Sequence, residues 1–256
     1  MPELETTKQR IRATLKRRDA QVEAFSARLQ RFLEKNLEKV IKAVQTGDVR
    51  GLEAAAVLEG MEGALRDAGL KNVIADAVEL YRDERDDVLD SLSSLKGEKV
   101  TLSNSDVTVV EKLITFETDK IEERIGTHVG DIRSIMMESV VMGQRPDASV
   151  IGDNLSDRLR AQIQTELDTS LMAFNRTVNA GKAQDVGLKY FLYIGPDDKI
   201  TRPFCQEHLG NVYTMDELAA MDNGQGLPVP QYLGGYNCRH FLVPVDTDKA
   251  EQIRNA

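Results

Sequence analysis

The sequence predicts a mainly α-helical protein, in which an elongated body of several helices precedes a small C-terminal module of mixed α and β structure. Apolar residues recur at spacings of three and four along most of the chain. Tryptophan is absent and aromatic residues make up only 5%, so the core must be aliphatic, as in many helical bundles. Five of the seven prolines follow residue 180. We therefore expect a helical body over 1–180, a module over 187–248 and a tail over 249–256.

The first three helices are predicted from apolar periodicity and from the residues that end them. The first has a stripe that ends before Gly47-Asp48, a helix stop followed by a possible N-cap. The others are expected at about 50–67 and 72–95. The third has a densely charged middle, 81–88, which we interpret as a solvated face, with an acidic binding site as the alternative. The first stripe consists of Leu29, Phe32, Leu33, Leu37, Val40, Ile41 and Val44.

Two further long helices are predicted after a loop at 96–104. Ser105-Asp106 is the expected cap of the first, which should end before Pro146, because the residue before a proline disfavours helix. Its expected buried face contains Val110, Leu113, Ile114, Ile121, Ile125, Ile132, Ile135, Met136, Ser139 and Val140. The face of the second contains Leu155, Leu159, Ile163, Leu167, Leu171, Phe174 and Val178.

The C-terminal module is predicted from strand, turn and capping signals. Residues 188–194 are rich in aromatic and β-branched types and indicate a strand, followed by a turn at 195–198. Thr201-Arg-Pro203 indicates a helix entry with threonine as N-cap. Thr214-Met-Asp-Glu217 fits a capping box for a helix over 216–221. A closing strand is expected at 240–245, with its proline near a sheet edge.

Composition and charge limit the classes of function. Hydrophobic residues make up 41% and charged residues 29%, a normal soluble mixture. The net charge of −9 argues against sequence-independent nucleic-acid binding by the whole surface. No apolar run approaches the roughly 20 residues that span a bilayer, and no signal peptide is recognised. Two cysteines indicate synthesis in a reducing compartment, the cytoplasm.

The N-terminal segment is basic within this acidic chain. We interpret it as an exposed helix face or a frayed end; contact with nucleic acid or an acidic partner surface is the alternative. The basic residues are Lys8, Arg10, Arg12, Lys16, Arg17 and Arg18.

Four of the five cysteine and histidine residues lie in the module, as Cys205-x2-His208 and Cys238-x-His240. A spacing of three shares a face on a helix, and a spacing of two shares a face on an extended segment, so both pairs can converge. Cys2His2 suits a tetrahedral zinc ion, which would stabilise a small module. A hydrogen-bonded cluster without metal and a Cys205–Cys238 disulfide are the alternatives. A nucleophilic cysteine lacks an identifiable third group to orient its base.

Two arginines flank these positions. Arg202 and Arg239 are expected either to bind an anion or, as we favour, to pair with Asp197 and Asp198 and so connect loops. The chain contains no phosphate-binding loop, dinucleotide fingerprint or His-Glu-x-x-His motif.

The module resembles the phage Mu protein F-like domain of head morphogenesis proteins, over about residues 140–248. The specific part is Thr201-Arg-Pro-x-Cys205 together with Asn237-Cys-Arg-His240. Gly235-Tyr236 stands where the family often has His-Pro, and His240 where it has a final cysteine. If these positions bind metal, the change keeps a ligand type; if they form a disulfide, it removes one sulfur. Other matching elements are Thr165-Glu166, 190–194, Asp198, His208 and Gly210.

This resemblance implies a non-enzymatic minor head protein in the virion, acting near the portal or inside the capsid in head assembly or DNA delivery. It implies portal or capsid proteins as partners and an oligomeric arrangement. Two other functions are kept: a Cys/His-based enzyme or toxin-like effector, and a virion protein that contacts DNA through the basic N-terminal helix.

Overall fold

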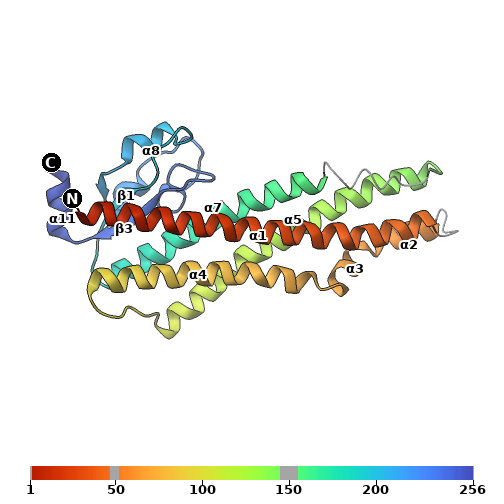
Figure 1. Ribbon diagram of the computed structural model, residues 1–256, viewed down its shortest axis with the longest axis horizontal. Helices are drawn as coiled ribbons and strands as arrows, with labels where there is room; N and C mark the ends of the chain where they lie inside the picture. The colour runs from red at the N-terminus through yellow and green to blue at the C-terminus, as the bar shows by residue number, and fades with distance from the viewer. Residues whose placement is uncertain (1, 47–51, 145–154, 256) are drawn as a thin grey trace. The chain divides into compact units, whose positions relative to one another are not determined.

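The computed structural model describes residues 2–46, 52–144 and 155–255 (Figure 1). Helices dominate these residues, and a three-stranded antiparallel sheet lies near the C-terminus. This confirms the predicted fold class, mainly α with a small α+β module. Among the described residues, no helix is both long and apolar enough to cross a membrane.

The long helices agree with the periodicity, with two differences. The segment predicted as one helix over about 50–67 is divided by a turn at Gly60, and the break at 47–51 lies outside the described residues. The last long helix continues through Gly181 to Asp185. The helices are α1 (Pro2–Thr46), α2 (Leu52–Glu59), α3 (Met61–Asp67), α4 (Leu70–Lys96), α5 (Asn104–Val141) and α7 (Leu155–Asp185).

The start of α5 corrects a predicted cap. The Ser103 hydroxyl accepts a hydrogen bond from the Asp106 backbone N–H at 3.2 Å, and the Asp106 carboxylate accepts one from the Ser103 N–H at 2.9 Å. This reciprocal pair is a capping box. Ser103 is therefore the cap, and the predicted Ser105-Asp106 cap was placed too late, because Asp106 closes the box from inside the helix.

The chain divides into two compact units. Unit 1 contains Met1–Gln21, Leu80–Ile114 and Leu167–Ala256, and unit 2 contains Val22–Glu79 and Thr115–Glu166. Parts of α1, α4, α5 and α7 therefore belong to each unit. Residues 187–248, predicted as a separate module, lie wholly in unit 1 together with helical segments.

Unit 2 has an aliphatic core built from the predicted stripes. Leu29, Leu33 and Leu37 of α1 are buried, whereas Ile135, predicted on the buried face of α5, is exposed. Ion pairs in this unit involve partly exposed side chains, for example Arg124 with Glu166 at 3.1 Å. Other buried members of the core are Ile41, Val44, Ile121, Ile125, Ile132, Met136, Leu159 and Ile163.

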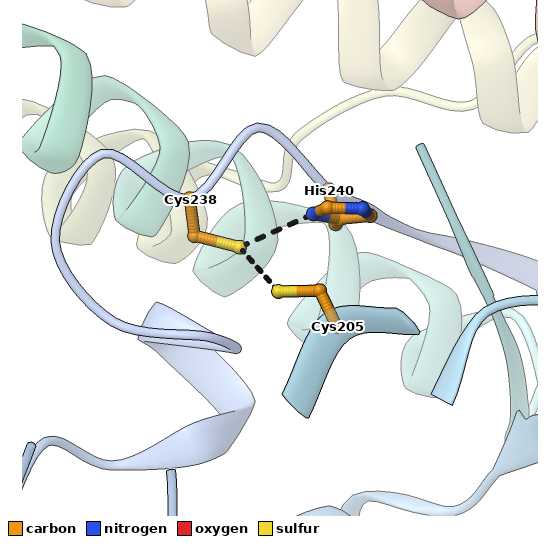
Figure 2. Close-up of side chains that lie close together, drawn as sticks. All are labelled: Cys205, Cys238 and His240. Atoms are coloured by element: carbon orange, nitrogen blue, oxygen red, sulfur yellow. Dashed lines mark hydrogen bonds between the residues drawn. The ribbon is translucent and has the colours of Figure 1, made fainter. Parts of the chain in front are cut away.

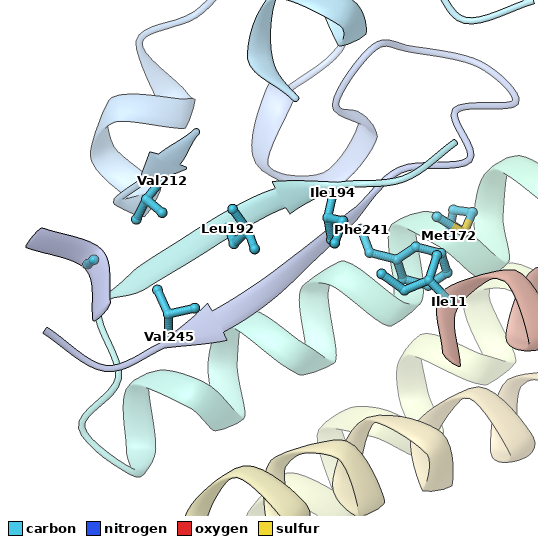
Figure 3. Packing of buried hydrophobic residues seen from close by; sticks show 8 residues of the cluster. Ile11, Met172, Leu192, Ile194, Val212, Phe241 and Val245 are labelled. Atoms are coloured by element: carbon cyan, nitrogen blue, oxygen red, sulfur yellow. The ribbon is translucent and has the colours of Figure 1, made fainter. Parts of the chain in front are cut away.

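The sheet of unit 1 has the order β2-β1-β3, with β1 at Tyr190–Ile194, β2 at Val212–Tyr213 and β3 at Phe241–Val245. Both predicted strands are present. Pro244 lies on the edge strand β3, where its missing N–H is tolerated. Figure 3 shows Ile11 of α1 and Met172 of α7 beside sheet residues of one buried cluster. The cluster contains Ile11, Met172, Leu192, Ile194, Val212, Phe241, Val245 and Ala250.

Short helices connect the strands: α8 (Pro203–His208), α9 (Met215–Ala219) and α10 (Val229–Tyr232). The Thr214–Glu217 capping box is confirmed. The N-cap of α8 is Arg202 rather than Thr201, because the Thr201 hydroxyl donates to the Pro196 carbonyl at 3.1 Å instead. The expected tail belongs largely to helix α11 (Thr247–Arg254), and Ala250 is fully buried.

A buried ion pair corrects two expectations about charge. Arg18 and Glu84 are both buried, and Arg18 Nε donates to Glu84 Oε1 at 2.6 Å. Asn175 donates to the second carboxylate oxygen at 2.9 Å. The charged middle of α4 is therefore not a purely solvated face. Arg18 leaves the predicted basic patch, and Arg17 pairs with Asp87, while Lys8, Arg10, Arg12 and Lys16 are exposed.

Candidate metal centre

Three predicted donor residues meet in unit 1. The Cys205 and Cys238 sulfurs are 3.8 Å apart, and the Cys238 sulfur is 3.5 Å from Nδ1 of His240. Figure 2 shows the three side chains pointing toward one another, with Cys205 on α8 and the others on the segment that leads into β3. Their exposed fractions are 1%, 3% and 2%, so the cluster is shielded from solvent. The two pairs that the sequence predicted to converge do converge, except for His208.

His208 does not join this cluster. Its Nδ1 is 2.8 Å from the Tyr213 hydroxyl, and its ring packs edge-on against Phe204 with centroids 4.4 Å apart. It occupies the last position of the six-residue helix α8, where these two aromatic side chains hold its ring. The predicted set of four donors is thus observed as a set of three, all within 4.8 Å of one another.

Close backbone approach makes the cluster possible. A Cβ atom at Gly234 would lie 2.2 Å from the Cys205 sulfur, and one at Gly195 would lie 2.5 Å from Cδ2 of His240. Any side chain at either glycine would therefore displace a donor. Leu233 and Asn237 adopt left-handed backbone conformations, with φ of 47° and 55°. Such strain in non-glycine residues is typical of functional sites.

Arg176 of α7 holds the chain around the cluster. It is 1% exposed, and its guanidinium donates to the carbonyls of His240 at 3.1 and 2.7 Å, of Cys238 at 2.7 Å and of Gln231 at 2.6 Å. One carbonyl of α10 and two of the segment before β3 are thereby satisfied. The same guanidinium brings a positive charge next to the sulfurs.

Each residue of Asn237-Cys-Arg-His240 has a defined anchor. The Asn237 backbone N–H donates to the Thr169 hydroxyl at 3.0 Å. Arg239 donates to both carboxylate oxygens of Asp198, at 2.7 and 2.8 Å, which holds the pKa of Asp198 down at about 2. This confirms the loop-connecting role predicted for Arg239. Arg202 is half-buried at the N-cap of α8 and forms no ion pair among the described residues.

The hydrogen bond at the far side of His240 orients its ring. Nε2 lies 2.9 Å from the Pro196 carbonyl, which can only accept, so Nε2 carries the proton. The other ring nitrogen, Nδ1, faces the Cys238 sulfur at 3.5 Å. A histidine that ligates a metal usually has this arrangement, with its other nitrogen donating to a carbonyl or carboxylate.

The contact between the two thiols shifts their pKa values in opposite directions. The contact between the Cys205 and Cys238 sulfurs, with His240 and Arg176 nearby, lowers the pKa of Cys238 despite burial. The same contact, together with burial, raises the pKa of the Cys205 thiol. A lowered pKa favours the thiolate of Cys238, the form that binds metal. The cysteines are free, so the structure does not contain the predicted alternative disulfide.

These groups fit a metal ion. Two sulfurs and an imidazole nitrogen are preferred ligands of zinc. One further observation points the same way. Among the described residues, the Tyr193 hydroxyl is the one buried side-chain nitrogen or oxygen atom without a hydrogen-bond partner, and it lies beside Cys205. The cluster can therefore hold a metal ion.

Three important residues were missed from the sequence: Thr169, Arg176 and Tyr193. A signal for the first two exists, because Thr169, Met172, Arg176 and Asn179 follow the spacing of a helix face. All four are buried in α7, and Asn179 donates to the Leu242 carbonyl. A second stripe beside the apolar one, in which three of the four residues are polar, therefore marks the face that contacts the module.

Comparison of the chain with models of protein families, with curated proteins and with solved structures found no match.

Proposed function

We propose that this protein is a minor head protein of a tailed bacteriophage, a structural component that acts near the portal or inside the capsid in head assembly or DNA delivery. The proposal begins from the two short stretches that resemble head morphogenesis proteins. These stretches are 33 residues apart when measured from Cys205 to Cys238, yet those two sulfurs are 3.8 Å apart. The resemblance is thus concentrated in residues that share one buried cluster, and this observation carries the proposal.

We further propose that the cluster binds zinc and that the zinc is structural. Zinc held by two thiolates, an imidazole and a fourth ligand from outside this set would connect α8 to the segment before β3, two elements that no strand pairing joins. Burial of all three donors supports a structural role, because a substrate needs access to the metal. The cluster also contains no carboxylate that could serve as a general base. The residues that would hold the ion are Cys205, Cys238 and His240.

A test in the virion addresses the structural role. We expect the chain to be found in purified heads or procapsids of the phage that encodes it, by mass spectrometry, at few copies per particle. A phage carrying Cys238→Ser should assemble fewer infectious particles. A matched change at an exposed position on α1, Lys35→Ala, should leave the yield unchanged.

Two results would contradict this role. The first is absence of the chain from every head, procapsid and virion fraction of an infected culture in which it is expressed. The second is a normal yield of infectious particles from a phage that lacks the gene.

A further inference from the structure

Tyr193 has an unusual combination of position and bonding. It lies in β1, its side chain is fully buried, and its hydroxyl has no hydrogen-bond partner. Buried hydroxyl groups in folded proteins are nearly always hydrogen-bonded, since an unpaired one is costly. We therefore expect the Tyr193 hydroxyl to gain its hydrogen-bond partner when a ligand binds.

The side-chain alternation of β1 places Tyr193 on the metal-site face of the sheet. Tyr190, Leu192 and Ile194 pack with the buried apolar cluster, so Tyr193 points to the opposite face. There its ring is 5.5 Å from the His240 ring, centroid to centroid, and its hydroxyl lies beside the Cys205 sulfur. Tyr193 thus borders two of the three donor residues.

The missing partner follows from the chemistry of the sulfurs. The Cys205 and Cys238 sulfurs are 3.8 Å apart, and the Tyr193 hydroxyl beside them has no hydrogen-bond partner. A neutral thiol is a weak acceptor, so the Tyr193 hydroxyl gains little from it. A bound zinc ion holds both sulfurs as thiolates, and a thiolate accepts a charge-assisted hydrogen bond.

We propose that Tyr193 is a positioning residue of the metal site, whose hydroxyl donates a hydrogen bond to the Cys205 thiolate once the metal is bound. This inference rests on the proposed zinc site. The hydroxyl acts through the sulfur and not as a ligand, because zinc in proteins prefers thiolate, imidazole and carboxylate ligands. Its role is to favour the metal-bound state, in which the buried hydroxyl finds its partner.

The test is Tyr193→Phe in the full chain. Zinc affinity is measured by competition with a chromophoric chelator under reducing conditions, and the Tm of the chelator-treated protein is measured separately. We expect zinc affinity to fall by about 10- to 100-fold, as for other groups that hydrogen-bond to a ligand. The Tm of the metal-free protein should be unchanged or higher, because the variant removes an unpaired buried hydroxyl.

Tyr190→Phe is the matched control, since it removes a hydroxyl from the same strand but from the face that packs with the apolar cluster. It should leave zinc affinity unchanged. In cobalt-loaded protein, Tyr193→Phe should move the sulfur-to-metal charge-transfer band to lower energy, because the Cys205 sulfur loses a hydrogen bond; Tyr190→Phe should not.

The outcomes separate this inference from the site on which it rests. If the wild-type protein binds no zinc, the proposed metal site is wrong and the inference falls with it. If the wild-type protein binds zinc and Tyr193→Phe binds it equally well, the site stands and the role of Tyr193 is overturned. A variant that loses metal-free stability together with affinity also overturns it, since Tyr193 would then act only through packing.

Discussion

The two units differ in what they bury. Among the described residues of unit 2, no Asp, Glu, Lys or Arg side chain is buried, and the core consists mainly of aliphatic stripes. Unit 2 also buries Phe25, Ser26, Thr118 and His128. Unit 1 buries Arg18, Glu84 and Arg176 together with two cysteines and a histidine. Every one of these charges has a specific partner, either the opposite charge or a group of carbonyls.

The difference teaches which features of the chain specify geometry. Apolar packing is non-directional and tolerates many arrangements of a stripe, whereas a buried charge is stable only when its hydrogen bonds are made. Unit 1 therefore has far fewer acceptable arrangements of its loops than an apolar core would allow. We expect substitutions in the polar network to be more damaging, and to affect metal binding, while substitutions in unit 2 affect stability alone.

Arg176→Met should have the largest effect. It leaves the carbonyls of Gln231, Cys238 and His240 without donors in a buried place, and we expect a loss of about 3–5 kcal/mol in the free energy of unfolding. Chemical denaturation measures it. Thr177→Ala, an exposed change on the same helix, is the control and should be nearly neutral. An Arg176→Met protein with wild-type stability and wild-type zinc affinity would contradict the claim that the polar network stabilises unit 1 and its metal site.

Separating Arg18 from Glu84 should be nearly as damaging. Glu84→Gln leaves a buried guanidinium without its counter-ion, which we expect to cost about 3–4 kcal/mol. The double variant Arg18→Met/Glu84→Leu should recover much of that loss, because no buried charge then remains. Denaturation of both variants measures the difference. If the double variant is less stable than Glu84→Gln, the ion pair stabilises the folded state by more than the cost of burying its two charges.

Leu33→Ala tests the core of unit 2. Removing a buried leucine side chain from the α1 stripe should cost about 2–4 kcal/mol. Zinc affinity should stay at the wild-type value, because Leu33 belongs to unit 2 and the donors to unit 1. Lys35→Ala, at an exposed position of the same helix, should cost much less. Loss of zinc affinity in Leu33→Ala would contradict the separation of stability from metal binding.

Asp168→Asn should have the smallest effect, and one that depends on pH. Burial, with the nearby Asp19 opposing ionisation and Arg18 favouring it, raises the pKa of Asp168 from 3.8 to about 6. The folded state therefore binds this proton more tightly, and stability from this group is lost as pH rises from 3.8 through 6.

Thermal unfolding checks this pH dependence. The variant should melt a few degrees above wild type at about pH 7.5, and the difference should shrink toward about pH 4.5. The exposed change Asp90→Asn should match wild type at both values. An equal difference at both pH values would mean that Asp168 acts through packing and not through its charge.

The sequence was sufficient for features that depend on local spacing. Helix periodicity located the long helices, and a capping box located α9, since both signals lie within a few residues. The convergence of Cys205 with Cys238 and His240 was also predictable, from donor chemistry and from the two spacings. These inferences did not require knowledge of which surfaces meet.

The partners of Arg176, His208 and Arg18 could not be predicted, because they depend on contacts between segments that are distant in the sequence. Nothing near Arg176 in the sequence reveals that its partners are the carbonyls of residues 231–240. His208 shared the predicted helix face with Cys205, yet Tyr213 and Phe204 hold its ring elsewhere. Arg18 looked like a surface cation until Glu84, 66 residues away, was placed against it.

The most direct test of the metal centre is the zinc content of the purified protein. After expression with zinc and dialysis under reducing conditions, wild type should retain about one zinc ion per chain, and chelation should lower its Tm. His208→Asn should retain the ion, whereas Cys238→Ser should lose it. Wild-type protein that retains no zinc and whose Tm does not change with zinc or chelator would contradict the account.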